Sequence, residues 1–318
     1  MLPLEPFLVE RITLPKVWGG RALATVLGIE LPADQQIGET WELYDRAEGS
    51  SRLRGRTTTL AELMVEPEAL VGRGVPLGFG ARFPLLLKFL DARDHLSLQV
   101  HPDDSQAHSD SGKNEACVVL QAGPKGAITY GFQPGVTRER FAQALAAGDV
   151  DGLMATFRPE VGDTIHIPPG TVHAIGPDVV VFEVQQNSDL TYRLFDFGRG
   201  REVHIPEAMA VMRVEASPGR PVVAPSVLAD GGVQLVATPQ FRLRRYSLRQ
   251  RLDLHTGGRF VTVTAIAGRG TLKWPGRRVH GTLDIATGDT VVVPACTARF
   301  TLIPNEHLNV ILCDPGER

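Results

Sequence analysis

One turn-and-strand segment occurs twice in this chain, and this repeat limits the folds that the chain can adopt. Residues 162–168 (GDTIHIP) match residues 288–294 (GDTVVVP) at an offset of 126, and Gly123 matches Gly268 at an offset of 145. Between these two matched points the first copy therefore holds 19 more residues than the second (145 − 126). This excess is close to the length of segment 137–157. Such self-similarity indicates a duplicated unit. We predict two related β-barrels, the first of which carries an insertion.

Strand signals dominate the rest of the sequence. Short apolar runs such as 85–90, 179–184 and 260–266 are separated by glycine, proline and aspartate turns, which is typical of sandwiches and jelly rolls. The predicted fold is mostly β, with two jelly-roll β-barrels, a helical insertion in the first barrel and a few short helices. We place the domain boundary between residues 1–214 and 215–318.

Helix signals occur in only three places. A capping box, Thr59 with Glu62, opens a short helical region that ends near residue 72. Amphipathic spacing covers the predicted insertion at about 137–157, with a break near Gly148, and a third candidate helix spans 205–214.

Composition excludes several classes of partner. The net charge of -3 gives no reason to expect nucleic acid as a partner, and no apolar run reaches the roughly 18 residues of a membrane span. The first ten residues carry two acids and no basic residue, which argues against a secretory signal. Cys117, Cys296 and Cys313 lack C-x-x-C spacing, so a reducing cytoplasm is expected. We predict a cytoplasmic monomer or homodimer.

Four side chains in three segments form a candidate metal site. Gln99 and His101 are two residues apart on a predicted strand and therefore project to the same side. Glu115 follows fourteen residues later, and His173 follows the tight turn Pro168-Pro169-Gly170. Two imidazoles, a carboxylate and an amide oxygen suit Zn2+, one per chain, and would also accept other divalent metals. This set leaves coordination positions open, which favours a catalytic site.

The second copy lacks these ligands. At an offset of 126, His173 falls on Arg299, and at an offset of 145, Glu115 falls on Phe260. We therefore predict that the second barrel is a structural partner without a metal.

Cations occur close to the candidate ligands. Lys88 lies inside an apolar run, where an unpaired ammonium is costly, so we expect it to point toward a pocket. Lys113 precedes Glu115 by two residues, and Arg193 follows the strand that contains Glu183. A metal flanked by such cations suits a sugar phosphate, because the metal binds hydroxyls and the cations bind phosphate or oxyanions.

The chain resembles the type I mannose-6-phosphate isomerases of the cupin superfamily, closest to their short bacterial form. The resemblance runs from residue 16 to about 200 and includes KVWGG, IGETWE, FPLLLK, LSLQVHPDD, GKNE and PPGTVHAIG. It implies cupin-like barrels and conversion of D-mannose 6-phosphate to D-fructose 6-phosphate. Tyr44 departs from the family, which usually has serine there. The last third of the chain matches only as a generic cupin-like barrel.

The resemblance also implies roles for individual residues. Gln99, His101, Glu115 and His173 would bind zinc, and Arg193 would be the active-site arginine. The implied substrate-binding side chains are Lys88, Lys113, Ser97 and Asp189, with Glu183 nearby.

The implied reaction moves a proton between C1 and C2 through an enediol. Lys113 is the first candidate for the base, and Glu183 and Asp189 compete with it. Two other classes of function stay open at this point: a non-catalytic cupin that binds metal and sugar phosphate, and a cupin metallo-oxygenase. Lys88, Lys113 and Arg193 argue against both, because an oxygenase has no use for them and a binding module needs fewer.

Overall fold

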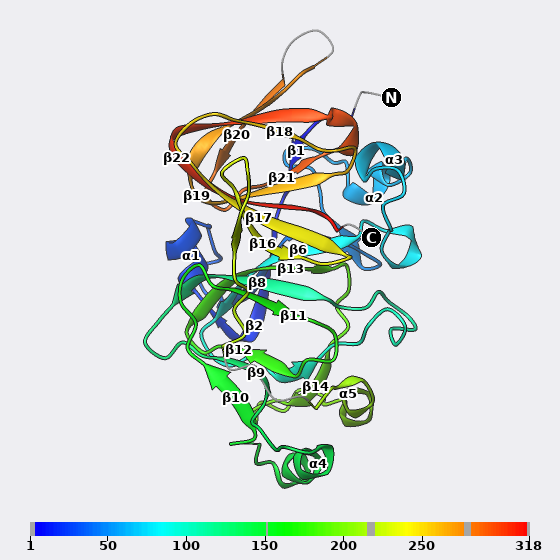
Figure 1. The fold of residues 1–318 in the computed structure, drawn as a ribbon, viewed down its shortest axis with the longest axis vertical. Helices are drawn as coiled ribbons and strands as arrows, with labels where there is room; N and C mark the ends of the chain where they lie inside the picture. The colour runs from blue at the N-terminus through cyan, green and yellow to red at the C-terminus, as the bar shows by residue number, and fades with distance from the viewer. Residues whose placement is uncertain (1–3, 151, 215–219, 277–280, 317–318) are drawn as a thin grey trace.

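The structure, a computed structural model, describes residues 4–150, 152–214, 220–276 and 281–316. Three β-sheets dominate it, and the helices are short (Figure 1). The predicted mostly β fold with few helices is confirmed. Within the described residues, none of the helices is long and apolar enough to cross a membrane.

Two antiparallel sheets make up the N-terminal body. The first has six strands in the order β11 (Thr164–Ile167), β8 (Glu115–Ala122), β13 (Val179–Gln186), β6 (Leu85–Ala92), β3 (Ile37–Leu43) and β2 (Ile12–Gly20). The second has five strands in the order β10 (Met154–Phe157), β9 (Ile128–Phe132), β12 (His173–Ile175), β7 (Leu98–Val100) and β14 (Tyr192–Phe195). A two-stranded ribbon joins β4 (Asp45–Arg46) to β5 (Gly49–Ser50).

A nine-stranded sheet forms the C-terminal body. Its main path is β1 (Phe7–Leu8), β21 (Thr290–Val293), β19 (Val261–Trp274), β22 (Arg299–Pro315), β17 (Phe241–Leu248), β16 (Val233–Ala237) and β15 (Ser226–Val227). Off this path, β18 (Leu252–His255) pairs with β22 and β20 (Gly281–Ala286) pairs with β19. Because β1 pairs with β21, the start of the chain contributes to this sheet. The domain boundary at 214/215 stays a prediction.

Apart from α1, the helices lie near the three segments in which the sequence predicts helices. They are α1 (Ala22–Leu27), α2 (Leu60–Leu63), α3 (Pro67–Leu70), α4 (Arg138–Ala147) and α5 (Ile205–Val211), with 3-10 turns at Phe79–Ala81 and Ala295–Thr297. The capping box of Thr59 and Glu62 is present. The predicted helical insertion is helical only as far as α4, because Gly148 takes a left-handed conformation and residues 154–157 form strand β10. Figure 1 shows α4 and α5 at the end away from the nine-stranded sheet.

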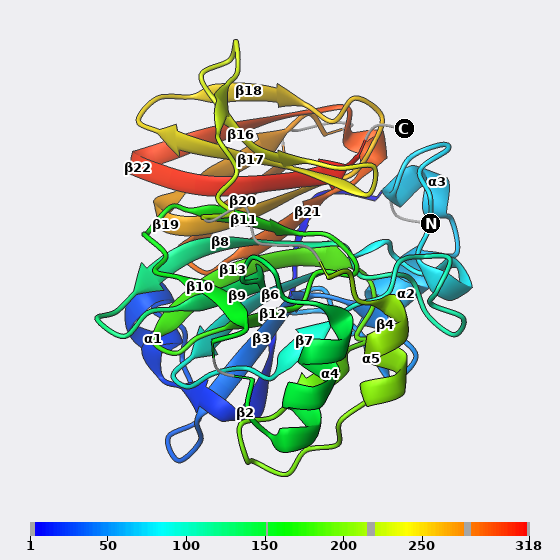
Figure 2. The ribbon, with the colours of Figure 1, turned by 60° about the horizontal axis from the view of Figure 1, so that its bottom comes forward.

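The six-stranded sheet is buried on both faces, and this explains its nearly continuous apolar strands. Alternate residues of β6 and β13, such as Phe89 and Phe182, pack in one core with Phe241 of β17 and Phe260, which precedes β19. The remaining residues of these strands face the five-stranded sheet. Figure 2 shows β22 and β17 stacked above β8 and β13, with β7 and β12 below them. The predicted site residues lie between the six-stranded sheet and the five-stranded sheet.

The internal repeat is visible as two turns with the same hydrogen bonds. Asp163 Oδ2 accepts from the backbone N–H of Glu160, as Asp289 Oδ2 accepts from that of Ala286, and Gly162 and Gly288 have φ of 92° and 88°. The strands that follow pair Ile167 with Glu115 and Val293 with Val261. The structural counterpart of Glu115 is therefore Val261. The sequence match to Phe260 was one residue out of register, because short gapped matches do not fix strand pairing.

Candidate active site

Neighbouring strands place the four predicted ligands together. Gln99 lies on β7, directly opposite His173 at the start of β12, and His101 follows the end of β7. Glu115 begins β8 on the facing sheet. His173 Nε2 is 3.0 Å from Glu115 Oε1, and His101 Nε2 is 3.5 Å from the same oxygen. His101, Glu115 and His173 are buried, and their ligand atoms lie within 4.8 Å of one another.

Backbone carbonyls fix both imidazole rings. His101 Nδ1 lies 2.9 Å from the Leu190 carbonyl oxygen, and His173 Nδ1 lies 3.0 Å from that of Thr171. A carbonyl can only accept, so Nδ1 of each ring carries a hydrogen, and Nε2 is the ring nitrogen that can bind a metal. Burial and the charge of Lys113 lower the pKa of His101 to about 4, which keeps that ring neutral. Both rings therefore present Nε2 toward Glu115, as ring nitrogens held by a hydrogen bond at Nδ1 do in metal sites.

The buried carboxylate of Glu115 lies beside one cation, the ammonium of Lys113. Among the described residues neither of its oxygens has a hydrogen bond of good geometry, although Lys113 Nζ is 2.9 Å from Oε2. Burial would raise the pKa of Glu115, but the neighbouring ammonium of Lys113 outweighs burial and holds the pKa well below its usual range. The Nε2 atoms of His173 and His101 lie 3.0 and 3.5 Å from Glu115 Oε1, so nitrogen and oxygen donors of the kind that bind divalent metals lie together. This donor set fits a divalent metal.

The amide of Gln99 completes the donor set. Its nitrogen lies 3.2 Å from His173 Nε2, and its oxygen lies 3.2 Å from Ser97 Oγ. The nitrogen and oxygen of an amide are assigned from the surrounding hydrogen bonds. Turning the amide by 180° presents the oxygen to the cluster and the nitrogen to Ser97, whose hydroxyl can accept as well as donate. Gln99 is therefore able to supply an oxygen ligand.

A cavity of about 210 Å³ opens beside the cluster. Most of the predicted site residues line it, namely Lys88, Ser97, Gln99, Lys113, Glu183, Asp189 and Arg193. The other three, His101, Glu115 and His173, form the buried cluster itself. The structure thus brings all ten predicted residues to one place.

Carboxylates surround the buried Lys88. Its Nζ lies 3.4 Å from Asp189 Oδ1, 3.7 Å from Glu39 Oε2 and 4.0 Å from Glu183 Oε1, and it sits over the Trp41 ring. Burial would lower the pKa of Lys88, but these carboxylates raise it. Lys88 points into the cavity, as expected, and it stays charged.

Glu183 differs from the other carboxylates that line the cavity. Burial, followed by repulsion from Glu115, raises the pKa of Glu183 to about 7. For Glu39 and Asp189 the neighbouring lysines outweigh burial and lower the pKa. A carboxyl with a pKa near neutrality can exchange a proton at little cost.

Arg193 lies beside the cluster on the same sheet. It pairs with Gln99, so His173, Gln99 and Arg193 form one row across β12, β7 and β14. Its Nη1 donates to the Glu202 carbonyl oxygen at 2.6 Å, and its Nε has no hydrogen-bond partner among the described residues. Burial and the charge of Arg201 lower the pKa of Arg193. Arg193 therefore has donor capacity left for a ligand.

Sequence reasoning missed three charged residues that line the cavity. Lys16 and Glu39 form an ion pair at 3.1 Å, and Arg201 donates from Nε to Asp196 Oδ1 at 2.8 Å. Glu39 was detectable in principle, because a buried lysine such as Lys88 needs carboxylate partners. Arg201 lies eight residues beyond Arg193 in a loop, and no periodic pattern marks it.

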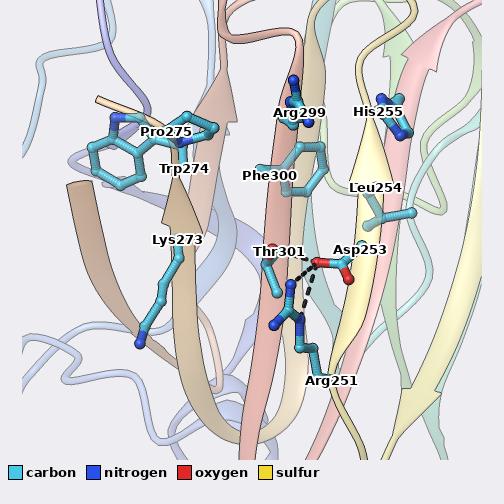
Figure 3. Close-up of a pocket in the computed structure, with 10 residues that line it drawn as sticks. All are labelled: Arg251, Asp253, Leu254, His255, Lys273, Trp274, Pro275, Arg299, Phe300 and Thr301. Carbon is cyan, nitrogen blue, oxygen red and sulfur yellow. Dashed lines mark hydrogen bonds and ion pairs between the residues drawn. The ribbon is translucent and has the colours of Figure 1, made fainter. Parts of the chain in front are cut away.

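A second pocket lies on the nine-stranded sheet, away from this cavity (Figure 3). It includes Arg299, the counterpart of His173 at an offset of 126, together with cations such as Arg251 and Lys273. Arg251 is held by an ion pair with Asp253 at 2.8 Å. Among the residues that the structure describes, the one group of metal-binding side chains is that of His101, Glu115 and His173.

Comparison with known proteins links this site to a family. A model of the type I phosphomannose isomerase catalytic domain matches residues 8–120. Mannose-6-phosphate isomerase from Streptococcus mutans is 32% identical over 284 residues, covering 84% of this chain and 87% of the relative. ManA of Bacillus subtilis is 32% identical over 312 residues, covering 94% of this chain and 96% of the relative.

Solved structures agree with these relatives. The mannose 6-phosphate isomerase of Bacillus subtilis has a TM-score of 0.86 and 28% identity, covering 98% of this chain and 99% of that one. A mannose 6-phosphate isomerase bound with zinc and yttrium shares the fold, with a TM-score of 0.79 and 17% identity over 99% of this chain and 100% of that one.

Proposed function

The chain belongs to the type I mannose-6-phosphate isomerase family, and we propose that its cavity interconverts D-mannose 6-phosphate and D-fructose 6-phosphate. One observation supports this proposal most directly. The buried cluster of His101, Glu115 and His173 lies beside a cavity that is lined by lysines and arginines. A metal with open positions and flanking cations suits a phosphorylated sugar with vicinal oxygens. We retain the predictions of a cytoplasmic location and of a monomer or homodimer.

Zinc is the metal that we propose for this site. His101, His173 and Glu115, with the amide oxygen of Gln99, would hold it, because two imidazoles with oxygen donors suit zinc better than a hard cation such as Mg2+. When bound, the metal supplies Lewis-acid charge next to the sugar oxygens. Lys113, whose Nζ lies 2.9 Å from Glu115 Oε2, would add a second positive charge beside the site.

The protein side chains divide the remaining tasks. Glu183, with its pKa raised to about 7, would move the proton between C1 and C2, in preference to Lys113, whose ammonium contacts Glu115. Arg193 would stabilise the negative charge that develops on the enediol oxygens. Arg201 and Lys16 would bind the phosphate, because both line the cavity and stay partly exposed.

Substituting Arg193 tests its proposed role separately from the metal. Arg193→Ala should lower kcat by roughly 100- to 1000-fold, because one donor to a developing oxyanion is lost. Metal content should stay normal, since Arg193 donates hydrogen bonds to His204 and to the Glu202 carbonyl oxygen, neither of which is a proposed ligand. Elemental analysis and steady-state kinetics measure both quantities, with Arg251→Ala in the pocket of Figure 3 as the matched control. Normal turnover by Arg193→Ala would show that the assigned role is wrong.

The reaction itself separates isomerase from the alternative functions. The purified chain should form fructose 6-phosphate from mannose 6-phosphate without consuming dioxygen. Dioxygen uptake with a sugar phosphate would favour the metallo-oxygenase. Metal and ligand binding without any product would favour the non-catalytic binding cupin.

A further inference from the structure

Asn114 lies between two residues of the proposed site. Lys113 and Glu115 on either side of it point to the cavity and the metal cluster. Since neighbouring residues of an extended chain alternate in direction, Asn114 points the opposite way, toward the C-terminal body. Asn114 is 6% exposed, so its polar atoms need partners inside the protein.

Every polar group of Asn114 has such a partner. Its side-chain Nδ2 donates to Gln240 Oε1 at 2.8 Å, and its Oδ1 lies 2.8 Å from His166 Nε2, which can donate to it. Its backbone N–H donates to Gln186 Oε1 at 3.0 Å, and its carbonyl accepts from the backbone N–H of Gln186 at 3.1 Å. Four hydrogen bonds therefore fix this one residue.

The same network fixes the strand end that carries His101. Gln186 Nε2 donates to Asp104 Oδ1 at 2.9 Å, and the same oxygen accepts from the Gly112 N–H at 2.8 Å. The Lys113 N–H donates to the Pro102 carbonyl oxygen at 2.9 Å. The segments that follow His101 and precede Glu115 are thus held against each other, which sets the spacing between the two proposed ligands.

Gln240 reaches this network from the other body of the protein. It lies in the turn between β16 and β17, where Thr238 Oγ1 accepts from its backbone N–H at 3.2 Å. Gln240 does not line the cavity beside the metal cluster. The hydrogen bond to Asn114 is the contact through which Gln240 reaches the segment that carries Lys113 and Glu115.

We infer that Gln240 is a positioning residue, through which the C-terminal body holds Asn114 and thereby orients Lys113 and Glu115 in the proposed metal site. The inference rests on the proposed roles of Lys113 and Glu115. It gives the second body a direct part in catalysis in addition to covering the shared core. Outer hydrogen-bond partners of metal ligands commonly influence metal affinity and rate.

The test uses the full-length zinc-loaded enzyme. Gln240→Ala should lower kcat and zinc affinity by about tenfold each while KM changes by less than about twofold, because ligand geometry changes and the cavity lining does not. Gln240→Glu keeps an oxygen that accepts from Asn114 and should restore both quantities. Steady-state kinetics and competition with a chelator measure them.

Two further variants separate positioning from general stability. Ile311→Val, in the core shared by the two bodies, should lower Tm and leave kcat and zinc affinity unchanged. If Gln240 acts through Asn114, adding Gln240→Ala to Asn114→Ala should have no further effect on kcat.

Three results would overturn the inference. One is a Gln240→Ala enzyme with kcat and zinc affinity within about twofold of wild type. The others are a Gln240→Glu enzyme as impaired as Gln240→Ala, and additive losses in the double variant. An inactive wild-type enzyme would instead contradict the proposed function, so the two failures are distinguishable.

Discussion

Replacing His173 by alanine should abolish stoichiometric zinc binding and lower kcat/KM at least about a thousandfold, because several kcal/mol of Lewis-acid stabilisation are lost. His173 is fully buried, and its Nε2 lies 3.0 Å from Glu115 Oε1. The substitution removes one of two imidazole donors and leaves the carboxylate without that neighbour. Elemental analysis and the isomerase assay on the same samples measure the effect.

The matched control for His173→Ala is His255→Ala. His255 lines the pocket of Figure 3 in the C-terminal body and belongs to no cluster of metal-binding side chains among the described residues. The control should keep both zinc and activity. His101→Gln serves as a second ligand variant, in case the cavity left by His173→Ala prevents folding. A folded His173→Ala enzyme with full activity would contradict the assigned ligand set.

Glu183→Gln should lower kcat by about 100- to 10,000-fold, which is the usual contribution of a positioned acid or base. The amide keeps the size of the side chain and cannot carry the proton. Zinc content should be unchanged, because Glu183 is not part of the His101, Glu115 and His173 cluster. Substrate labelled with deuterium at C2 should lose the label from C2, to C1 of the product or to solvent, with wild type and retain it at C2 with Glu183→Gln.

Lys113→Met and Asp189→Asn test the competing candidates for the base. Asp189 has a lowered pKa because Lys88 outweighs its burial, so it is a weaker base than Glu183. Its substitution should affect KM more than the exchange of label. Retention of label by Lys113→Met, together with normal exchange by Glu183→Gln, would transfer the role of base to Lys113.

The grouping of the proposed metal ligands could be predicted because their signals are local. Gln99 and His101 share a strand face, and the turn at Pro168-Pro169-Gly170 places His173 at the start of the next strand. Lys88 was predictable for a different reason, since a lysine inside an apolar run must find polar partners. The positions of these side chains can be predicted from a few neighbouring residues in each segment.

Contacts between distant segments could not be predicted in this way. Asn114 and Gln240 are 126 residues apart, and neither residue stands out in its own segment. The counterpart of Glu115 was misplaced by one residue because strand pairing, not sequence matching, sets the register. Residues 154–157 pair with β9 as a strand, a tertiary contact that outweighs the helical spacing of that segment.

The most direct test of the central claim follows one enzyme sample through removal and return of its metal. Fructose 6-phosphate formed from mannose 6-phosphate is measured before chelation, after chelation and after stoichiometric zinc is added back. The account predicts that activity disappears with the metal and returns in proportion to the zinc bound. Full activity in metal-free enzyme, or no fructose 6-phosphate from zinc-loaded enzyme, would contradict it.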